Sequence, residues 1–236
     1  MSPTDPKRAR DCYADVAALP LSEVRELLVG GAPAERVWAS WALALALGSD
    51  FIPQAEALTR AEPEPGVRRH LIVILAGAGE RAAVRALAAH DPDPYVRATA
   101  HRYLLLAAPE EERNDTIAGL LTAASSDASA TTREECVRLL AGRWPRDREP
   151  DVAKLLEAPV DGIRAAAMEL LLEPPVASSQ AGAVARQAIR EAGPTRTDWW
   201  TRLVHAGRAE SILEFLPTSR AHELAALRRA LGAVDP

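Results

Sequence analysis

Apolar residues recur along most of the chain at intervals of three and four, which is the period of an α-helix. The clearest case is HDPDPYVRATAHRYLLLAA at residues 90–108, where a turn rich in aspartate and proline precedes Val96, Ala100 and Leu104. The four-residue spacing places these three side chains on one helix face. The stretch therefore predicts a turn at residues 91–94 and a helix with one buried face directly after it.

The same arrangement returns at intervals of about 30 residues, each time as an apolar or branched anchor residue that follows a turn. The anchors are Val37, Val67, Val96, Thr132, Ile163 and Trp199. The positions four and eight residues after each anchor are predicted to be buried. They are Trp41 and Leu45, Leu71 and Leu75, Ala100 and Leu104, Cys136 and Leu140, Ala167 and Leu171, and in the last unit Leu203.

A second helical pattern lies between successive anchored helices. It covers residues 51–61, 80–90, 113–124, 149–158 and 182–193. One helix pair cannot bury its own apolar faces, so neighbouring pairs are expected to stack. Aromatic residues make up 4% of the chain, and β-branched runs typical of strands are nearly absent. These patterns predict an all-α fold.

The repeated unit resembles a HEAT repeat, in the HEAT-like form found in bacteria. In that family an acidic residue stands five positions before the anchor and an arginine directly follows it. Asp91 and Arg97 around Val96 match this pattern, and Asp127 and Arg133 match it around Thr132. The resemblance implies a right-handed α-solenoid of five to six helix pairs over residues 32–216. Residues 1–31 are expected to form an N-terminal capping segment and residues 217–236 a C-terminal capping helix.

The resemblance also implies that the acids and arginines form a hydrogen-bonded ladder inside the stack, because turn carbonyls and helix amides there need partners. The residues assigned to this ladder are Arg68, Asp91, Arg97, Asp127, Arg133 and Arg164. The first and sixth units are read as lacking both members of the pair. Most of the conspicuous charges are thereby interpreted as structural.

Charge and cysteine content narrow the classes of function. The net charge is −5 and lysine occurs twice, which disfavours a surface tuned as a whole for nucleic acid. Cys12 and Cys136 have no metal-ligand spacing, and Cys136 is expected to be a core residue rather than a nucleophile. We expect no metal and no cofactor. The longest apolar run, residues 37–48, is too short to cross a bilayer, and no signal peptide is recognised. A cytoplasmic protein is expected.

In HEAT-like stacks the anchored helices line the concave side, so positions two, three and six residues after each anchor are expected to face a binding groove. The candidates are Arg69, His70, Arg102, Arg138, Glu169 and His205. Arg69, Arg102 and Arg138 form a predicted basic stripe. The alternative for each residue is a solvated helix face, with Glu134 and Arg138 as an ordinary i,i+4 pair.

Two tryptophans are added to the candidate binding residues. Trp144 lies in the loop AGRWPRDREP and either packs under the loop or offers an exposed anchor. Trp199 and Trp200 are adjacent, so one of them is expected in the core and Trp200 is expected to be partly exposed. Trp38 and Trp41 are predicted to fill the core near the N-terminal cap.

The function expected from these features is a non-catalytic protein-interaction module, that is, a scaffold, adaptor or regulatory subunit. One alternative is a nucleic-acid-binding protein that resembles HEAT-like DNA alkylpurine glycosylases, with Asp198 and the adjacent tryptophans as the relevant residues. A second alternative, on fold alone, is a protein similar to HEAT-like bilin lyases. An enzymatic function is left open but is not favoured.

Overall fold

The computed structural model describes residues 13–174, 178–190, 194–206 and 208. Its described residues form helices and no strand. The chain divides into two compact units, Met1–Thr116 and Ile117–Pro236, and each is described by itself. The predicted C-terminal capping helix at 217–236 lies outside the described residues, whereas helix α2, Leu21–Gly30, lies in the predicted N-terminal capping segment. The all-α prediction is confirmed.

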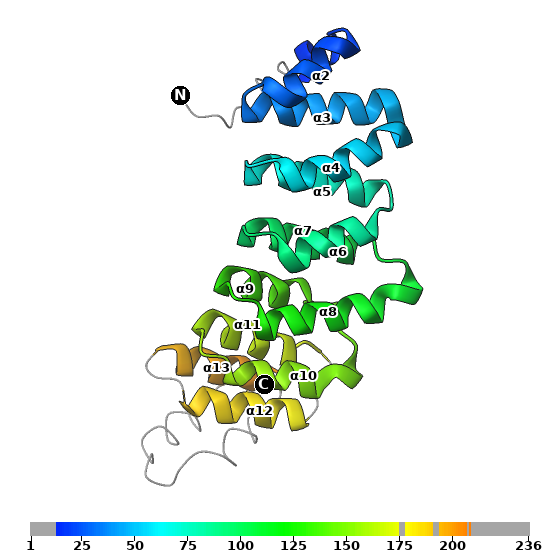
Figure 1. The fold of residues 1–236 in the computed structure, drawn as a ribbon. Helices are drawn as coiled ribbons and strands as arrows, with labels where there is room; N and C mark the ends of the chain where they lie inside the picture. The colour runs from blue at the N-terminus through cyan, green and yellow to red at the C-terminus, as the bar shows by residue number, and fades with distance from the viewer. Residues whose placement is uncertain (1–12, 175–177, 191–193, 207, 209–236) are drawn as a thin grey trace. The chain divides into compact units, whose positions relative to one another are not determined.

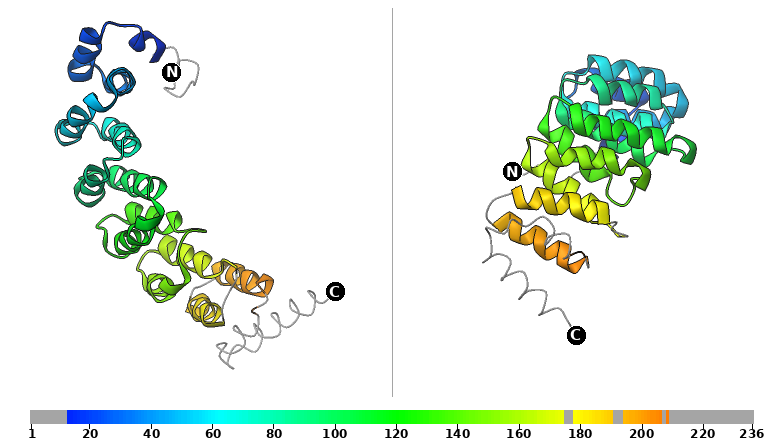
Figure 2. Two further views of the ribbon diagram at one scale, coloured as in Figure 1. Left: turned by 90° about the vertical axis from the view of Figure 1, so that its right-hand side faces the viewer. Right: turned by 90° about the horizontal axis from the view of Figure 1, so that it is seen from below.

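Unit 1 contains α2 followed by anchored helices that alternate with the second helix of each pair (Figure 1). The anchored helices are α3, Pro33–Leu47, α5, Pro65–Gly77, and α7, Pro94–Leu106. The second helices are α4, Ile52–Ala61, α6, Arg81–His90, and α8, Arg113–Ser126, which continues into unit 2. Helix α5 packs against both α3 and α7, and Figure 2 (left) shows helices of this unit nearly end-on.

Unit 2 continues the alternation. Its anchored helices are α9, Ala130–Leu139, α11, Asp161–Leu171, and α13, Pro194–His205. Between them come α10, Glu149–Lys154, and α12, Ser178–Arg190. Helix α11 packs against α9, α10 and α12, and α12 packs against α13. Short 3-10 helices lie at Gly48–Phe51, Glu110–Glu112, Arg146–Arg148 and Leu155–Glu157.

The start of α7 shows how local sequence defines a helix end. Asp93 is the N-cap, and its carboxylate accepts hydrogen bonds from the amides of Tyr95 at 2.9 Å and Val96 at 3.0 Å. Pro94 occupies the first turn, where its missing N–H costs nothing. At the other ends of helices, Gly48, Gly79 and Gly142 have positive φ angles, which glycine adopts without strain. The predicted turn at 91–94 is confirmed.

The predicted buried stripe is confirmed in the second to fifth repeats. Val96, Ala100 and Leu104 are buried, as are the corresponding residues of α5, α9 and α11. The first repeat is the exception, because Leu45 is 72% exposed and Trp41 is half-buried. Ala39 and Leu43 are buried in their place. In α3 the position that corresponds to the anchor is therefore Glu35, two residues before Val37, although its own side chain is charged and exposed.

Substitutions at Leu43 and Leu45 test this change of register. Leu43→Ala is expected to lower the free energy of unfolding by about 3 kcal/mol, because it leaves a cavity in the core. Leu45→Ala should change it by less than about 0.5 kcal/mol, because that side chain is already in solvent. Urea unfolding followed by circular dichroism measures both. Equal losses of unfolding free energy in the two variants would instead support the register anchored at Val37.

The acid–arginine ladder is confirmed for Arg68 and Asp91, which pair between neighbouring repeats. The guanidinium of Arg68 donates two hydrogen bonds of 2.8 Å to the Asp91 carboxylate, from Nε and Nη2. Its Nη1 donates to the carbonyls of Glu62 and Pro63 in the preceding turn. Both side chains of the pair are almost fully buried. This bidentate pair ties α5 to the turn between α6 and α7.

The other ladder arginines make the same bond to the turn before their own helix. Arg97 donates to the Asp91 carbonyl at 2.7 Å, and Arg164 donates to the Ala158 carbonyl at 2.9 Å. Arg133 donates to the Asp127 carbonyl. Each of these carbonyls stands six residues before its arginine. The arginine that follows the anchor therefore satisfies a backbone acceptor left open at the turn.

The prediction that the first repeat lacks the arginine is wrong, because Arg36 takes that place and pairs with Glu62, the acid of the second repeat. Arg36 donates from Nε and Nη2 to Glu62 at 2.8 and 2.7 Å and from Nη1 to the Gly31 carbonyl. Burial opposes ionisation of Glu62, but the hydrogen bonds from Arg36 and from the Glu64 amide outweigh it, so the pKa of Glu62 is lowered. Arg36 directly follows Glu35, which is the anchor position in the corrected register.

Arg81 makes a further inter-helix contact that the repeat pattern does not predict. Its Nη1 donates to the carbonyls of Leu104 and Ala107 at the end of α7, at 3.2 and 2.8 Å. Its Nε and Nη2 reach Glu112 and Thr116. One guanidinium thus satisfies the open carbonyls at the C-terminal end of α7 and joins α6 to the start of α8.

Candidate functional site

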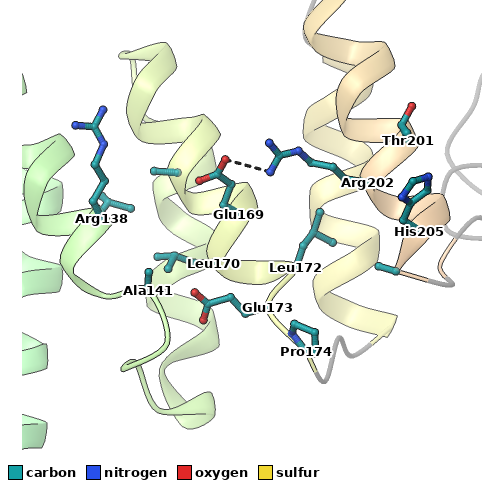
Figure 3. A pocket seen from close by; sticks show the side chains of 13 residues that line it. Arg138, Ala141, Glu169, Leu170, Leu172, Glu173, Pro174, Thr201, Arg202 and His205 are labelled. Carbon is teal, nitrogen blue, oxygen red and sulfur yellow. Dashed lines mark hydrogen bonds and ion pairs between the residues drawn. The ribbon is translucent and has the colours of Figure 1, made fainter.

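A groove in unit 2 brings together three of the residues predicted to bind a partner. Arg138, Glu169 and His205 each stand six residues after an anchor, on α9, α11 and α13, and all three line the same groove of about 710 Å³ (Figure 3). The residue six positions after an anchor shares a helix face with the residues two and three positions after it, and the groove leaves that face uncovered. The sequence pattern thus locates a real concavity within this unit.

The floor of the groove is apolar. Its residues come mainly from α9, α11 and the turns that follow them: Val137, Ala141, Ala166, Leu170, Leu172 and Pro174, with Ala206 after α13. Figure 3 shows Leu170, Leu172 and Ala141 lower in the view than Arg138, Glu169 and Arg202. A floor of this kind, with charges at its edge, is the usual composition of a protein-binding surface.

Charges of both signs stand above the floor. Arg202 donates from Nη1 to Oε1 of Glu169 at 3.1 Å, which links α13 to α11 (Figure 3). The Arg202 guanidinium also lies 4.8 Å from the centroid of the Trp199 ring, a cation–π contact. Arg138 forms the predicted i,i+4 pair with Glu134, at 3.5 Å. These contacts hold the charged groups in place at the rim without burying them.

Arg202 and Glu173 belong to the groove, but the sequence analysis does not select them. Arg202 stands three residues after the anchor Trp199, so the rule of positions two, three and six already contains the signal for it. Glu173 lies beyond the end of α11 and is not two, three or six residues after an anchor. Its carboxylate accepts hydrogen bonds from the Gly142 amide at 2.9 Å and the Trp144 indole at 3.1 Å.

The two candidate tryptophans are buried. Trp144 is 6% exposed and packs under its loop, with Arg146 stacked 4.6 Å from its ring centroid. Trp200 is 8% exposed, so the expectation of a partly exposed face there is not met. Trp199 is buried as predicted.

The remaining candidates, Arg69, His70 and Arg102, lie in unit 1. All three side chains are exposed, Arg69 and His70 on α5 and Arg102 on α7. Arg69 donates to the Thr99 hydroxyl of α7 at 3.2 Å. Desolvation by the surrounding protein and the charge of Arg69 lower the pKa of the His70 imidazole. The stripe that joins Arg69 and Arg102 to Arg138 stays a prediction, since Arg138 belongs to the other unit.

Cys136 lies in the core of unit 2 as predicted, and burial raises the pKa of its thiol to about 12. The thiolate is the reactive form, so at pH 8 the native thiol should react with a disulfide reagent about three orders of magnitude more slowly than an ordinary cysteine. A Cys12→Ser variant isolates this thiol, and labelling followed by mass spectrometry measures it with and without denaturant. Rapid labelling of the native protein would contradict the burial.

Among residues 13–174, 178–190, 194–206 and 208, no three His, Cys, Asp or Glu side chains are placed to hold a metal ion together. None of the helices in those ranges is long and apolar enough to cross a bilayer.

Comparison of the chain with protein-family models, with curated proteins and with solved structures found no match in any of the three.

Proposed function

We propose that the chain is a non-catalytic protein-interaction module and that the groove between α9, α11 and α13 binds its partner. The supporting observation is the groove itself. It has a volume of about 710 Å³, an apolar floor and exposed charges of both signs at its edge. Mixed charge over an apolar floor suits a protein surface. A phosphate backbone favours a uniformly basic surface, and Glu169 and Glu173 oppose it here.

We further propose that the repeated helix pairs form a right-handed, HEAT-like α-solenoid. The packing of α5 between α3 and α7, and of α11 against α9, supports side-to-side stacking of successive pairs. The arginine bonds to the preceding turn, made at corresponding positions by Arg68, Arg97 and Arg164, support one repeated unit. A compact domain of this length has a radius of gyration of about 18 Å. Small-angle X-ray scattering should give a clearly larger value, and a value near 18 Å would contradict the solenoid.

Affinity purification from the native host, followed by mass spectrometry, tests the binding function. The informative variant is Ala141→Trp, which places an indole in the groove from an exposed position without changing the charge. The matched control is Ala78→Trp. Ala78 is also exposed, follows an anchored helix and precedes a glycine of positive φ, and it lies in the other unit.

A protein partner is expected to bind the wild-type chain and the Ala78→Trp variant and to be lost with Ala141→Trp. Retention of the same proteins by Ala141→Trp would exclude the groove as their site. If the chain captured no protein but bound duplex DNA with a steep dependence on salt, the nucleic-acid function would replace the proposed one.

A further inference from the structure

Two arginines flank the floor of the unit 2 groove with donor groups left over. Arg138 projects from α9 and Arg202 from α13, and their side chains are 64% and 54% exposed. Figure 3 shows them on opposite sides of Glu169, so the rim carries a positive, a negative and a positive charge in sequence. A guanidinium has five N–H donors arranged as a fork that fits a carboxylate. The rim is therefore equipped to receive carboxylates at two points.

The side chain of Arg202 is the more restrained of the two. Its guanidinium stacks on Trp199, and one of its nitrogens, Nη1, donates to Glu169. A side chain already restrained in this way loses less conformational entropy when it binds a second carboxylate. Glu169 is itself 56% exposed, so it can share Arg202 or turn toward a cation of a partner without leaving a buried charge.

Arg138 is held more weakly. Its contact with Glu134 is 3.5 Å long, at the limit of a hydrogen bond, and an exposed i,i+4 pair of this type contributes little to stability. Exchange of Glu134 for a carboxylate of the partner therefore costs little. A partner carboxylate that also approaches the groove floor is better shielded from solvent than the one it replaces.

The surroundings of the floor favour a helix as the partner segment. The floor is built from side chains of α9, α11 and the turns that follow the helices, and the described residues contain no strand, so an extended peptide finds no strand edge to pair with. An amphipathic helix satisfies its own backbone and presents a continuous apolar stripe. Side chains next to that stripe then meet the charged rim.

We propose that the groove binds an amphipathic helix of a partner protein whose apolar stripe is flanked by carboxylates, and that Arg202 and Arg138 receive those carboxylates. This inference rests on the proposed function and specifies the chemistry of the partner. Arg202 provides the main contact because it is preorganised, and Arg138 provides the second. Glu169, between them, selects against a helix whose flanking residue at that point is also acidic.

Three designed 18-residue helical peptides provide the test. They share one leucine and alanine stripe and a glutamine opposite Glu169, and the flanking positions that meet Arg138 and Arg202 carry Glu, Gln or Lys. Fluorescence anisotropy with the full chain is expected to give an affinity at least tenfold higher for the Glu peptide than for the Lys peptide, with the Gln peptide between them. The double variant R138E/R202E should reverse this order.

The matched control is the double variant R60E/R113E, which changes the charge equally. Arg60 and Arg113 are exposed and, like Arg138, pair with a glutamate of their own segment, but they lie in unit 1. The control should leave all three affinities unchanged. Addition of salt should weaken the binding of the Glu peptide more than that of the other two peptides.

The outcomes separate this inference from the proposed function. Equal affinities for the three peptides, an inverted order, or insensitivity to R138E/R202E would overturn the acidic helix while leaving the groove as a binding site, provided that Ala141→Trp still abolishes binding. Binding that survives Ala141→Trp would overturn the groove as well. No binding of any peptide at millimolar concentration would overturn the helix as the partner segment.

Discussion

Replacement of Arg68 with methionine is expected to lower the free energy of unfolding by about 3 to 5 kcal/mol, because it leaves the Asp91 carboxylate charged and buried without its partner. The Asp91 side chain is 2% exposed, and both of its oxygens accept hydrogen bonds from Arg68. The substitution also leaves the carbonyls of Glu62 and Pro63 without the Nη1 donor. The turn between α6 and α7 should open first.

Urea unfolding at pH 7, followed by circular dichroism, measures this loss. The matched control is Arg60→Met, which removes an exposed arginine paired with Glu56 one turn away and should cost less than about 0.5 kcal/mol. The double variant Arg68→Met, Asp91→Asn removes the buried charge as well, so it should be more stable than Arg68→Met alone. If Arg68→Met and Arg60→Met unfold at the same urea concentration, the buried pair does not contribute as proposed.

Trp144→Ala is expected to cost about 3 to 5 kcal/mol, as large aromatic truncations in a core do. The indole is buried under the loop between α9 and α10, and its Nε1 donates to Glu173 at 3.1 Å. The same carboxylate accepts the Gly142 amide, so Trp144 and Gly142 together join this loop to the end of α11. Loss of the ring removes both the packing and one of these bonds.

Two further variants separate packing from hydrogen bonding at this site. Trp144→Phe keeps most of the ring and should lose only about 1 kcal/mol, the usual net contribution of one hydrogen bond. Tyr95→Ala removes an aromatic side chain that is 59% exposed and should have little effect. Thermal and urea unfolding measure all three. A stable Trp144→Ala protein that loses its binding partner would show that Trp144 is a contact residue and not a core residue.

The positions of helices and turns could be predicted because their causes are local. Asp93 and Pro94 favour a helix start through the N-cap and the fixed φ angle, and the interval of four from Val96 to Leu104 places apolar residues on one face. The register of α3 could not be predicted in the same way. There Val37 is an apolar residue and Glu35 is charged, so the pattern selects Val37 as the anchor. Burial instead follows the packing of α3 on α5, which the residues of α3 alone do not specify.

The candidate site was predictable in part. The rule of positions six residues after the anchor selected Arg138, Glu169 and His205, because residues in corresponding positions of stacked helices share a face. The rule could not decide the exposure of tryptophans. The residues next to Trp144 and Trp200 in the sequence do not distinguish a buried tryptophan from an exposed one. The burial of these side chains depends on segments more distant along the chain.

The sequence by itself determined that this chain is helical, where its turns lie, and which residues of most repeats face the core. Those properties follow from helix period, capping and proline geometry, which act over a few residues. The tertiary structure decided which side chains meet across the repeats: Arg36 with Glu62, Trp144 with Glu173, and Arg202 with Glu169. These partners are 26 to 33 residues apart, so their pairing depends on how one helix pair packs on the next, and no local pattern encodes that distance.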